Sequence, residues 1–144
     1  MNQSKIKFSW LLLIFAAGVL ALTGCMTVTP TPKPGEVFSC AKDSDLNKII
    51  APEASLENFS CVIKKWAGAN TLHFNVAVKN ISNEDQRFKV NIFLENGKAV
   101  GGLLPRKIKK GLIKPGDTAK FTYPVKGVAG AAGKIDLIIK TMSK

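Results

Sequence analysis

Few residues of this chain have side chains that catalyse reactions or hold metal ions. There are three cysteines and a single histidine, His73, and no Cys-x-x-Cys pair occurs. A zinc site takes three or four such ligands, and nucleophilic catalysis takes a nucleophile, a base and an orienting group within mutual reach. Gly-x-Ser-x-Gly, a phosphate-binding glycine loop and His-Glu-x-x-His are also missing. We therefore expect no enzyme, no cofactor and no metal site, and we expect His73 to be a surface or interface residue.

The first residues have the layout of a secretory signal peptide. Lys5 and Lys7 precede an apolar run over residues 8–22, in which Ser9 is the one polar break. A run of about 15 residues is short for a membrane span, which takes roughly 20, and it suits the apolar region of a signal peptide. The run ends in Leu22-Thr23-Gly24-Cys25.

The tetrapeptide Leu22-Thr23-Gly24-Cys25 resembles the lipobox of bacterial lipoproteins, whose pattern is Leu, a small residue, Gly or Ala, and Cys. The resemblance implies that residues 1–24 are cleaved and that Cys25 becomes the acylated first residue of a protein anchored in the bacterial cell envelope. Met26 follows, where Gram-negative lipoproteins retained at the inner membrane carry aspartate. In a Gram-negative cell this favours the outer membrane, facing the periplasm.

If Cys25 carries lipid, two cysteines remain, Cys40 and Cys61. Two cysteines in an oxidising compartment more often form a bridge than stay free. We expect a Cys40–Cys61 disulfide, and two buried free thiols are the alternative.

A proline-rich tether and one domain follow the lipid site. Residues 25–36 carry prolines at positions 30, 32 and 34, which favours an extended spacer of roughly 30 Å at about 3.1 Å per residue. Residues 37–144 are enough for one compact domain.

Alternation of apolar and polar residues indicates strands in this domain, because successive side chains of a strand point to opposite faces. Short strands with turns every 8–12 residues predict an all-β fold, a single immunoglobulin-like β-sandwich, with a small barrel as the alternative. We expect about seven strands, near 59–66, 72–80, 87–95, 98–104, 106–113, 118–125 and 134–141.

Several local patterns predict particular turns. Asn96-Gly97 favours a two-residue hairpin turn with positive φ at both positions, and Pro115-Gly116 favours a type II turn. Gly101-Gly102 indicates a β-bulge. Before the first predicted strand, residues 45–50 have the spacing of a short helical turn, and Ser55 is a candidate helix cap.

Three turn motifs resemble a recurrent bacterial envelope module, the small immunoglobulin-like domains of FxLYD and YcfL-type lipoproteins. The resemblance covers residues 76–125 and implies the fold. Its motifs are Val78-Lys79-Asn80-Ile81-Ser82, Glu95-Asn96-Gly97, and Lys114-Pro115-Gly116-Asp117 followed by Phe121.

Positive charge is concentrated in the second half of the chain. The net charge is +11, and residues 71–144 hold 14 Lys and Arg against 5 acidic residues. One interpretation of the densest part is a solvated edge whose lysines block aggregation. The other is a surface for a polyanion or an acidic partner, such as anionic lipid, lipopolysaccharide, teichoic acid or an acidic protein; nucleic acid is not expected in this compartment. The candidate polyanion-binding residues are Arg106, Lys107, Lys109, Lys110 and Lys114.

Alternation also predicts an outward-facing apolar pair, Phe93 and Ile138. In an immunoglobulin-like order their strands would flank the 118–125 strand in one sheet. An apolar pair rimmed by lysines is typical of a modest protein-binding surface, although scattered exposed apolar residues are also common. The lysines expected on this face are Lys89, Lys120, Lys134 and Lys140.

These patterns together predict a lipid-anchored envelope protein that works by binding. The leading hypothesis is a non-catalytic accessory module for an envelope protein assembly. One alternative is an adaptor that binds an anionic envelope polymer or lipid through Arg106–Lys114. A further alternative is an accessory lipoprotein of a type VI secretion system.

Overall fold

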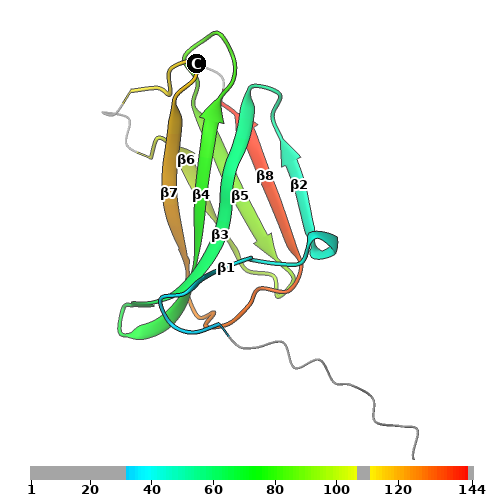
Figure 1. Cartoon of the computed structure of the whole chain (residues 1–144), viewed down its shortest axis with the longest axis vertical. Coiled ribbons are helices and arrows are strands. Elements are labelled where there is room, and N and C mark those ends of the chain that lie inside the picture. The colour runs from blue at the N-terminus through cyan, green and yellow to red at the C-terminus, as the bar shows by residue number, and fades with distance from the viewer. Residues whose placement is uncertain (1–31, 107–110, 143–144) are drawn as a thin grey trace, which may run out of the picture. The chain divides into compact units, whose positions relative to one another are not determined.

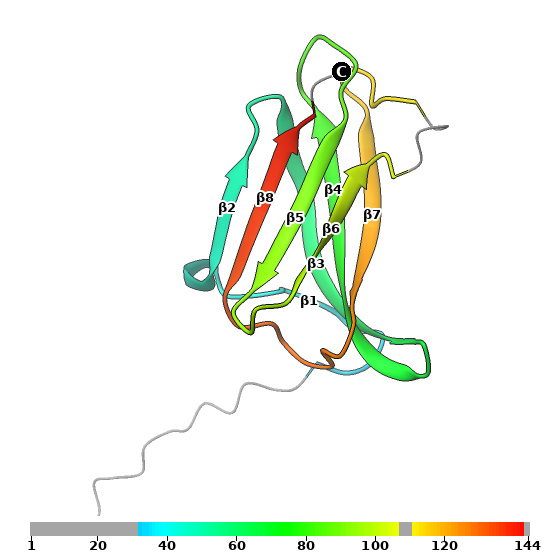
Figure 2. The same cartoon turned by 180° about the vertical axis from the view of Figure 1, so that it is seen from behind.

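The computed structural model describes residues 32–106 and 111–142, and in them the chain forms two four-stranded sheets. The sheet orders are β1-β3-β4-β7 and β2-β8-β5-β6, and the sheets face each other across an apolar core (Figure 1; Figure 2). The prediction of an all-β sandwich is confirmed. The elements are β1 (Val37–Phe38), a 3₁₀ turn (Asp43–Asp45), β2 (Leu46–Ile50), β3 (Ala54–Trp66), β4 (Ala69–Asn80), β5 (Phe88–Leu94), β6 (Ala99–Leu104), β7 (Thr118–Val125) and β8 (Ile135–Thr141).

The strand order resembles an immunoglobulin fold with one substitution. Strands β3, β4 and β7 occupy the places of strands A, B and E, and β5 and β8 occupy those of C and F. Strand G normally lies beside F, but here that place is taken by β2, which precedes β3 in the chain. As a result β2 pairs with β8 in parallel, whereas the other strand pairs of the two sheets are antiparallel.

The core forms because alternate residues of the long strands point between the sheets. On β4, Leu72, Phe74, Val76 and Val78 are fully or almost fully buried. Across the gap, β5 and β8 contribute their own alternate residues. The Phe74 ring also stacks on Phe59 of β3, with 5.5 Å between ring centroids. The buried residues that β5 and β8 supply are Phe88, Val90, Ile92, Leu94, Ile135, Leu137 and Ile139.

Three local predictions differ from what the described residues show. Among the described residues of the segment 106–113 there is no strand, and Ile113 makes only an isolated bridge to Gln86. Pro105 lies directly after β6, and a proline cannot donate to a ladder, so the edge strand ends there. Residues 45–50 are not a helical turn, because Leu46–Ile50 is strand β2. Ser55 caps no helix, since it lies inside β3.

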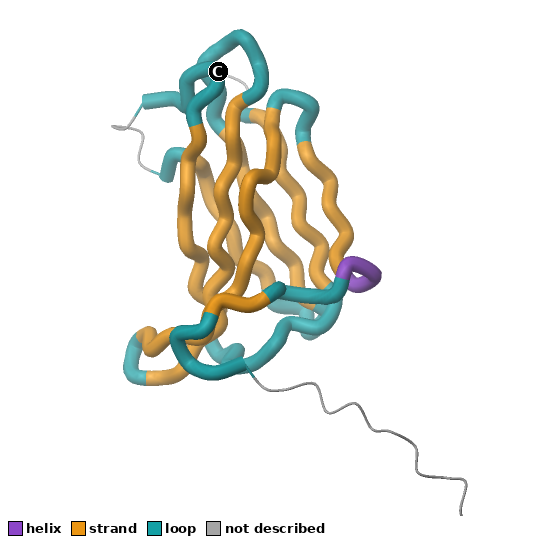
Figure 3. Tube along the Cα trace, in the orientation of Figure 1, coloured by secondary structure: helices purple, strands orange, loops and turns teal. Residues whose placement is uncertain are grey.

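Figure 3 shows the loops and turns that connect the strands. The turn motifs are partly as predicted. The type II turn at Pro115-Gly116 is confirmed, because Gly116 has φ +82° and Asp117 N–H donates to Lys114 O at 3.0 Å. The two-residue turn at Asn96-Gly97 is wrong. Leu94 N–H donates to Lys98 O at 2.8 Å, and only Gly97 has positive φ, so the loop holds three residues with glycine in the left-handed region. Gly101 and Gly102 lie in unbroken register with β5 and form no bulge.

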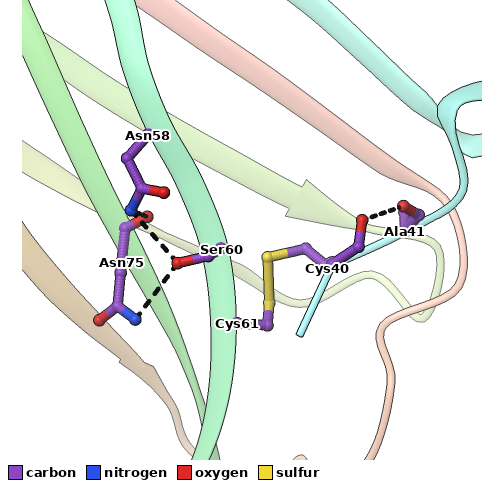
Figure 4. The surroundings of a disulfide bond; sticks show 7 residues. Cys40, Ala41, Asn58, Ser60, Cys61 and Asn75 are labelled. Carbon is purple, nitrogen blue, oxygen red and sulfur yellow. Dashed lines mark hydrogen bonds between the residues drawn. A yellow bond between two sulfur atoms is a disulfide. The ribbon is translucent and has the colours of Figure 1, made fainter. Parts of the chain in front are cut away.

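The disulfide between Cys40 and Cys61 is confirmed. The two Cα atoms are 4.9 Å apart, and both residues are buried in the core. Figure 4 shows that Cys61 and its neighbour Ser60 leave β3 on opposite sides. The bridge therefore ties the segment after β1 to the inner face of the β3–β4 sheet.

A buried asparagine joins three segments at the end of β4. The Asn80 side chain has no exposed surface, and its amide N–H groups donate to Glu84 O at 2.7 Å and Ile113 O at 2.8 Å. Its amide oxygen accepts from both the backbone N–H and the hydroxyl of Ser82. The Asn80 backbone N–H donates to Asp117 O. The Asn80 backbone thus connects the motif 78–82 with the motif 114–117, and its side chain holds Ser82, Glu84 and Ile113 beside them.

We predict that Asn80→Asp destabilises the domain strongly. An aspartate cannot donate to the carbonyl oxygens of Glu84 and Ile113, and each buried polar group left without a partner costs about 1–3 kcal/mol. We expect the free energy of unfolding in urea to fall by about 3 kcal/mol or more. The matched control is Asn83→Asp in the same loop, where the side chain is exposed and the change should be within about 0.5 kcal/mol. Equal stabilities for the two variants would contradict the role of Asn80.

Candidate functional site

The outer surface of the second sheet has a regular arrangement of side chains. In the row that crosses its middle, Ile49 of β2 lies opposite Ile138 of β8, and Ile138 lies opposite Asn91 of β5. In the next row of outward-facing residues, Phe93 of β5 lies opposite Asp136 of β8. We refer to the outer surface formed by Ile49, Lys89, Phe93, Ile138 and Lys140 as the β5–β8 face.

Large apolar side chains on the β5–β8 face are open to solvent. The exposed fraction is 55% for Ile49 and 45% for Phe93, and Ile138 between them is partly exposed. They lie on three strands of a hydrogen-bonded sheet, so their spacing is rigid. Large apolar side chains grouped on one rigid surface, with polar residues around them, are typical of a protein-binding surface.

Charges lie on two sides of this apolar area. Lys89 and Lys140 are register partners on β5 and β8 and form one rim. The opposite rim carries the carboxylate of Asp136, whose Oδ1 accepts a hydrogen bond from Asn47 Nδ2 at 3.1 Å. Asp136 is therefore engaged within the sheet, and the exposed lysine pair gives the face a cationic side.

The structure brings together four of the six residues expected on this face, namely Phe93, Ile138, Lys89 and Lys140. The expectation for Lys120 is wrong, because it lies on β7 in the other sheet. Because residues 106–113 were counted as a strand, β7 was assigned to the next position in the immunoglobulin strand order, between β5 and β8. In the structure β5 and β8 are direct neighbours. Lys134 precedes β8 in a loop, where its backbone carbonyl accepts from Glu95 N–H.

The sequence reasoning missed Ile49. Residues 46, 49 and 50 are apolar, which is the spacing of one helix face, and five residues are too few for periodicity to separate a helical turn from a strand. The available signal was the pair Ile49-Ile50, since β-branched residues favour strands.

The outer face of the first sheet is polar by contrast. Ser60, Asn75 and Thr122 are register partners on β3, β4 and β7. Thr122 Oγ1 donates to Asn75 Oδ1 at 2.9 Å, and Asn75 Nδ2 lies 3.5 Å from Ser60 Oγ. Asn58 joins this row through Ser60 Oγ at 3.2 Å (Figure 4). These groups largely satisfy one another in the middle of this face, and the large exposed apolar side chains of the same sheet, Val37 and Trp66, lie away from this row.

His73 is not a surface residue as expected. It lies on the outward side of β4, opposite Val62 and Pro124, but only 7% of it is exposed. Its Nδ1 is 2.8 Å from the carbonyl oxygen of Thr71, and a carbonyl only accepts, so Nδ1 carries the proton. The hydrogen bond is local and points to a packing role.

The basic segment is described only at its two ends. Arg106 places its guanidinium 4.7 Å from the centroid of the Phe121 ring, a cation–π contact. Arg106 and Phe121 also line a groove of about 410 Å³ beside β7. Lys114 is exposed at the type II turn. The other candidate polyanion-binding residues, Lys107, Lys109 and Lys110, lie outside the described residues.

Tyr123 is a buried phenol behind this segment. Its ring is 4.7 Å from that of Phe121, and its hydroxyl has no hydrogen-bond partner among the described residues. Burial raises the pKa of Tyr123 from 10.0 to about 12, while the Arg106 cation acts in the opposite direction. The hydroxyl is thus protonated at neutral pH.

Within residues 32–106 and 111–142, no group of three or more His, Cys, Asp or Glu side chains could hold a metal ion. In the same residues no helix is long and apolar enough to cross a bilayer.

Comparison with known proteins finds no family model, no curated protein and no solved structure that matches this chain.

We predict that the two adjacent glycines of β6 respond differently to a methyl group. A Cβ on Gly101 would overlap with the carbonyl oxygen of Val90 on the neighbouring strand, whereas a Cβ on Gly102 would lie 3.6 Å from the Tyr123 ring. Gly101→Ala should lower the free energy of unfolding by about 1–3 kcal/mol, as overpacking does. Gly102→Ala is the control and should change it by less than about 1 kcal/mol. Urea denaturation measures both, and a harmless Gly101→Ala would contradict the close approach of β6 to β5.

We also predict that Tyr123 makes stability depend on pH in the alkaline range. Because its pKa is 10.0 when unfolded and about 12 when folded, the unfolded chain releases the proton first. The stabilisation of the folded state that the raised pKa of Tyr123 provides is fully present below pH 10 and is lost as the pH rises through 12. The chain has one tyrosine, so tyrosinate absorbance reports this group alone. Tyr123→Phe should remove this part of the pH dependence of unfolding, and an absorbance midpoint near pH 10 in the folded protein would refute the prediction.

Proposed function

We propose that this protein is a lipid-anchored component of the bacterial cell envelope that acts as a non-catalytic binding module. In this proposal Cys25 carries the lipid, and the sandwich domain docks to a larger envelope protein assembly. The motif Leu22-Thr23-Gly24-Cys25 supports the anchor. The buried Cys40–Cys61 disulfide supports export, because such bonds persist in oxidising compartments.

The observation that carries the binding role is the solvent-exposed apolar area of the β5–β8 face. Ile49 and Phe93 each expose about half of their surface on a rigid sheet, beside the partly exposed Ile138. Apolar and aromatic anchors at the centre of an interface supply most of its binding energy. Lys89 and Lys140 at the rim favour a partner with acidic residues around its own apolar centre, since complementary charge speeds association and selects partners.

We predict that Phe93→Asp combined with Ile138→Asp abolishes partner binding. Buried anchors of an interface cost about 2 kcal/mol or more when removed, which is about 30-fold in affinity. The measurement is crosslinking in native cells from a photoreactive residue at position 103, where Leu103 lies opposite Lys89 on the same sheet. A discrete protein adduct should form in the unchanged protein and disappear in the double variant.

One control and one further variant make this test specific. The control is Ile81→Asp, in the loop after β4. Ile81 is as exposed as Ile49, at 55% each, but it lies outside the β5–β8 face, so the adduct should remain. Ile49→Asp alone should weaken the adduct with little risk to the fold, because Ile49 lies on an edge strand. Adducts that survive in folded Phe93→Asp/Ile138→Asp protein would overturn the proposal. A lipid or glycan smear in place of a protein band would favour the adaptor function.

A further inference from the structure

The β3–β4 hairpin extends beyond the rest of the sandwich. Its last pairs, from Lys64–Thr71 to Trp66–Ala69, have no third strand beside them in the part of the chain that the structure describes, because β7 pairs with β4 only from Leu72 onwards. Strand β1 pairs with β3 only at Cys61 and Val62. Figures 1 and 2 show the hairpin projecting at the lower end of the molecule. Its tip is a tight turn in which Ala67 and Gly68 both have positive φ.

The side chains of this tip suit the surface of a membrane. Trp66 is 42% exposed, and Lys64 and Lys65 beside it are exposed as well. No acidic residue occurs between Lys64 and Asn70. Tryptophan prefers the membrane–water interface, where its ring is in an apolar layer and its N–H is near polar headgroups. Lysine is attracted to anionic headgroups.

The chain enters the domain at the same end. Gly35 N–H donates to Ile63 O at 2.8 Å, and Val37 of β1 pairs with Val62. These contacts lie at the base of the projecting hairpin. Gly35 follows Cys25 by ten positions, and a fully extended chain spans at most about 3.6 Å per residue. A lipid on Cys25 would therefore keep Gly35, and with it the base of the hairpin, within roughly 36 Å of the bilayer.

We propose that the β3–β4 hairpin is a second, non-covalent contact with the membrane, in which Trp66 enters the headgroup layer and Lys64 and Lys65 bind anionic lipid headgroups. This inference rests on the lipid anchor of the proposed function. A short tether and a hairpin contact at the same end restrict the orientation of the domain. The strands then stand away from the bilayer, and the β5–β8 face is directed sideways, where a partner in the envelope can reach it.

The test uses the acylated protein, which begins at Cys25 once residues 1–24 are cleaved; the cleavage removes Trp10 and leaves Trp66 as its one tryptophan. The protein is reconstituted into vesicles of phosphatidylcholine and phosphatidylglycerol, with and without brominated acyl chains. We expect bromolipid to quench Trp66 fluorescence. Lys64→Gln with Lys65→Gln should lower the equilibrium constant of the contact about 30-fold, since each basic residue near an anionic surface contributes about a factor of five.

The control is Lys89→Gln with Lys140→Gln, which removes two lysines from the β5–β8 face and should leave the quenching unchanged. Sedimentation of the vesicles tests the lipid anchor separately from the hairpin contact. Protein that sediments with vesicles but shows no quenching would overturn the hairpin contact and leave the anchor intact. Protein that does not sediment would overturn both. Quenching that both lysine pairs reduce equally would also refute the hairpin contact, because it would reflect net charge alone.

Discussion

The buried side-chain amide of Asn80 is the contact on which one end of the sandwich depends. Its two N–H groups and its oxygen are all engaged, so it fixes the spacing between the end of β4, the loop after it and the segment before β7. An asparagine amide donates twice and accepts twice in one plane, which neither aspartate nor serine does. Because the Asn80 backbone also pairs with the type II turn, β7 starts in register, and Tyr123 comes to lie opposite Phe74 in the core.

The difference between the two outer faces follows from the order of the strands. Strand β2 takes the outer place beside β8, and its parallel register puts Ile49 in line with Ile138. On the other sheet, register partners at the corresponding outward positions are hydroxyl and amide groups that bind one another. The middle of one face therefore has its polar groups satisfied, whereas the middle of the other leaves apolar side chains in water. Burying those side chains against a partner would gain the hydrophobic free energy that folding left unused.

The misplacement of Lys120 in the sequence interpretation has its origin in one segment. Residues 106–113 alternate like a strand, and accepting them as one displaced every later strand by one place in the assumed order. Lys120 was consequently assigned to the same face as Phe93, although β7 lies in the opposite sheet. The assignments of Phe93, Ile138, Lys89 and Lys140 to one face survived, because each depended on alternation within β5 or β8 and these strands are neighbours.

The amino-acid sequence by itself determined the local features of this protein. It specified which residues of each long strand share a face, the type II turn at Pro115-Gly116, the all-β class and, through the lipobox resemblance, the pairing of Cys40 with Cys61. Only the tertiary structure decided which strands are neighbours, that Leu46–Ile50 is a strand, and that Asn80 joins two motifs. The physical reason is the distance along the sequence over which each interaction acts. Alternation and turn preferences act between residues a few positions apart, whereas β2 gains its strand conformation from β8, as in the contact of Asn47 with Asp136, 89 positions away. A pairing over that distance depends on how the whole core packs.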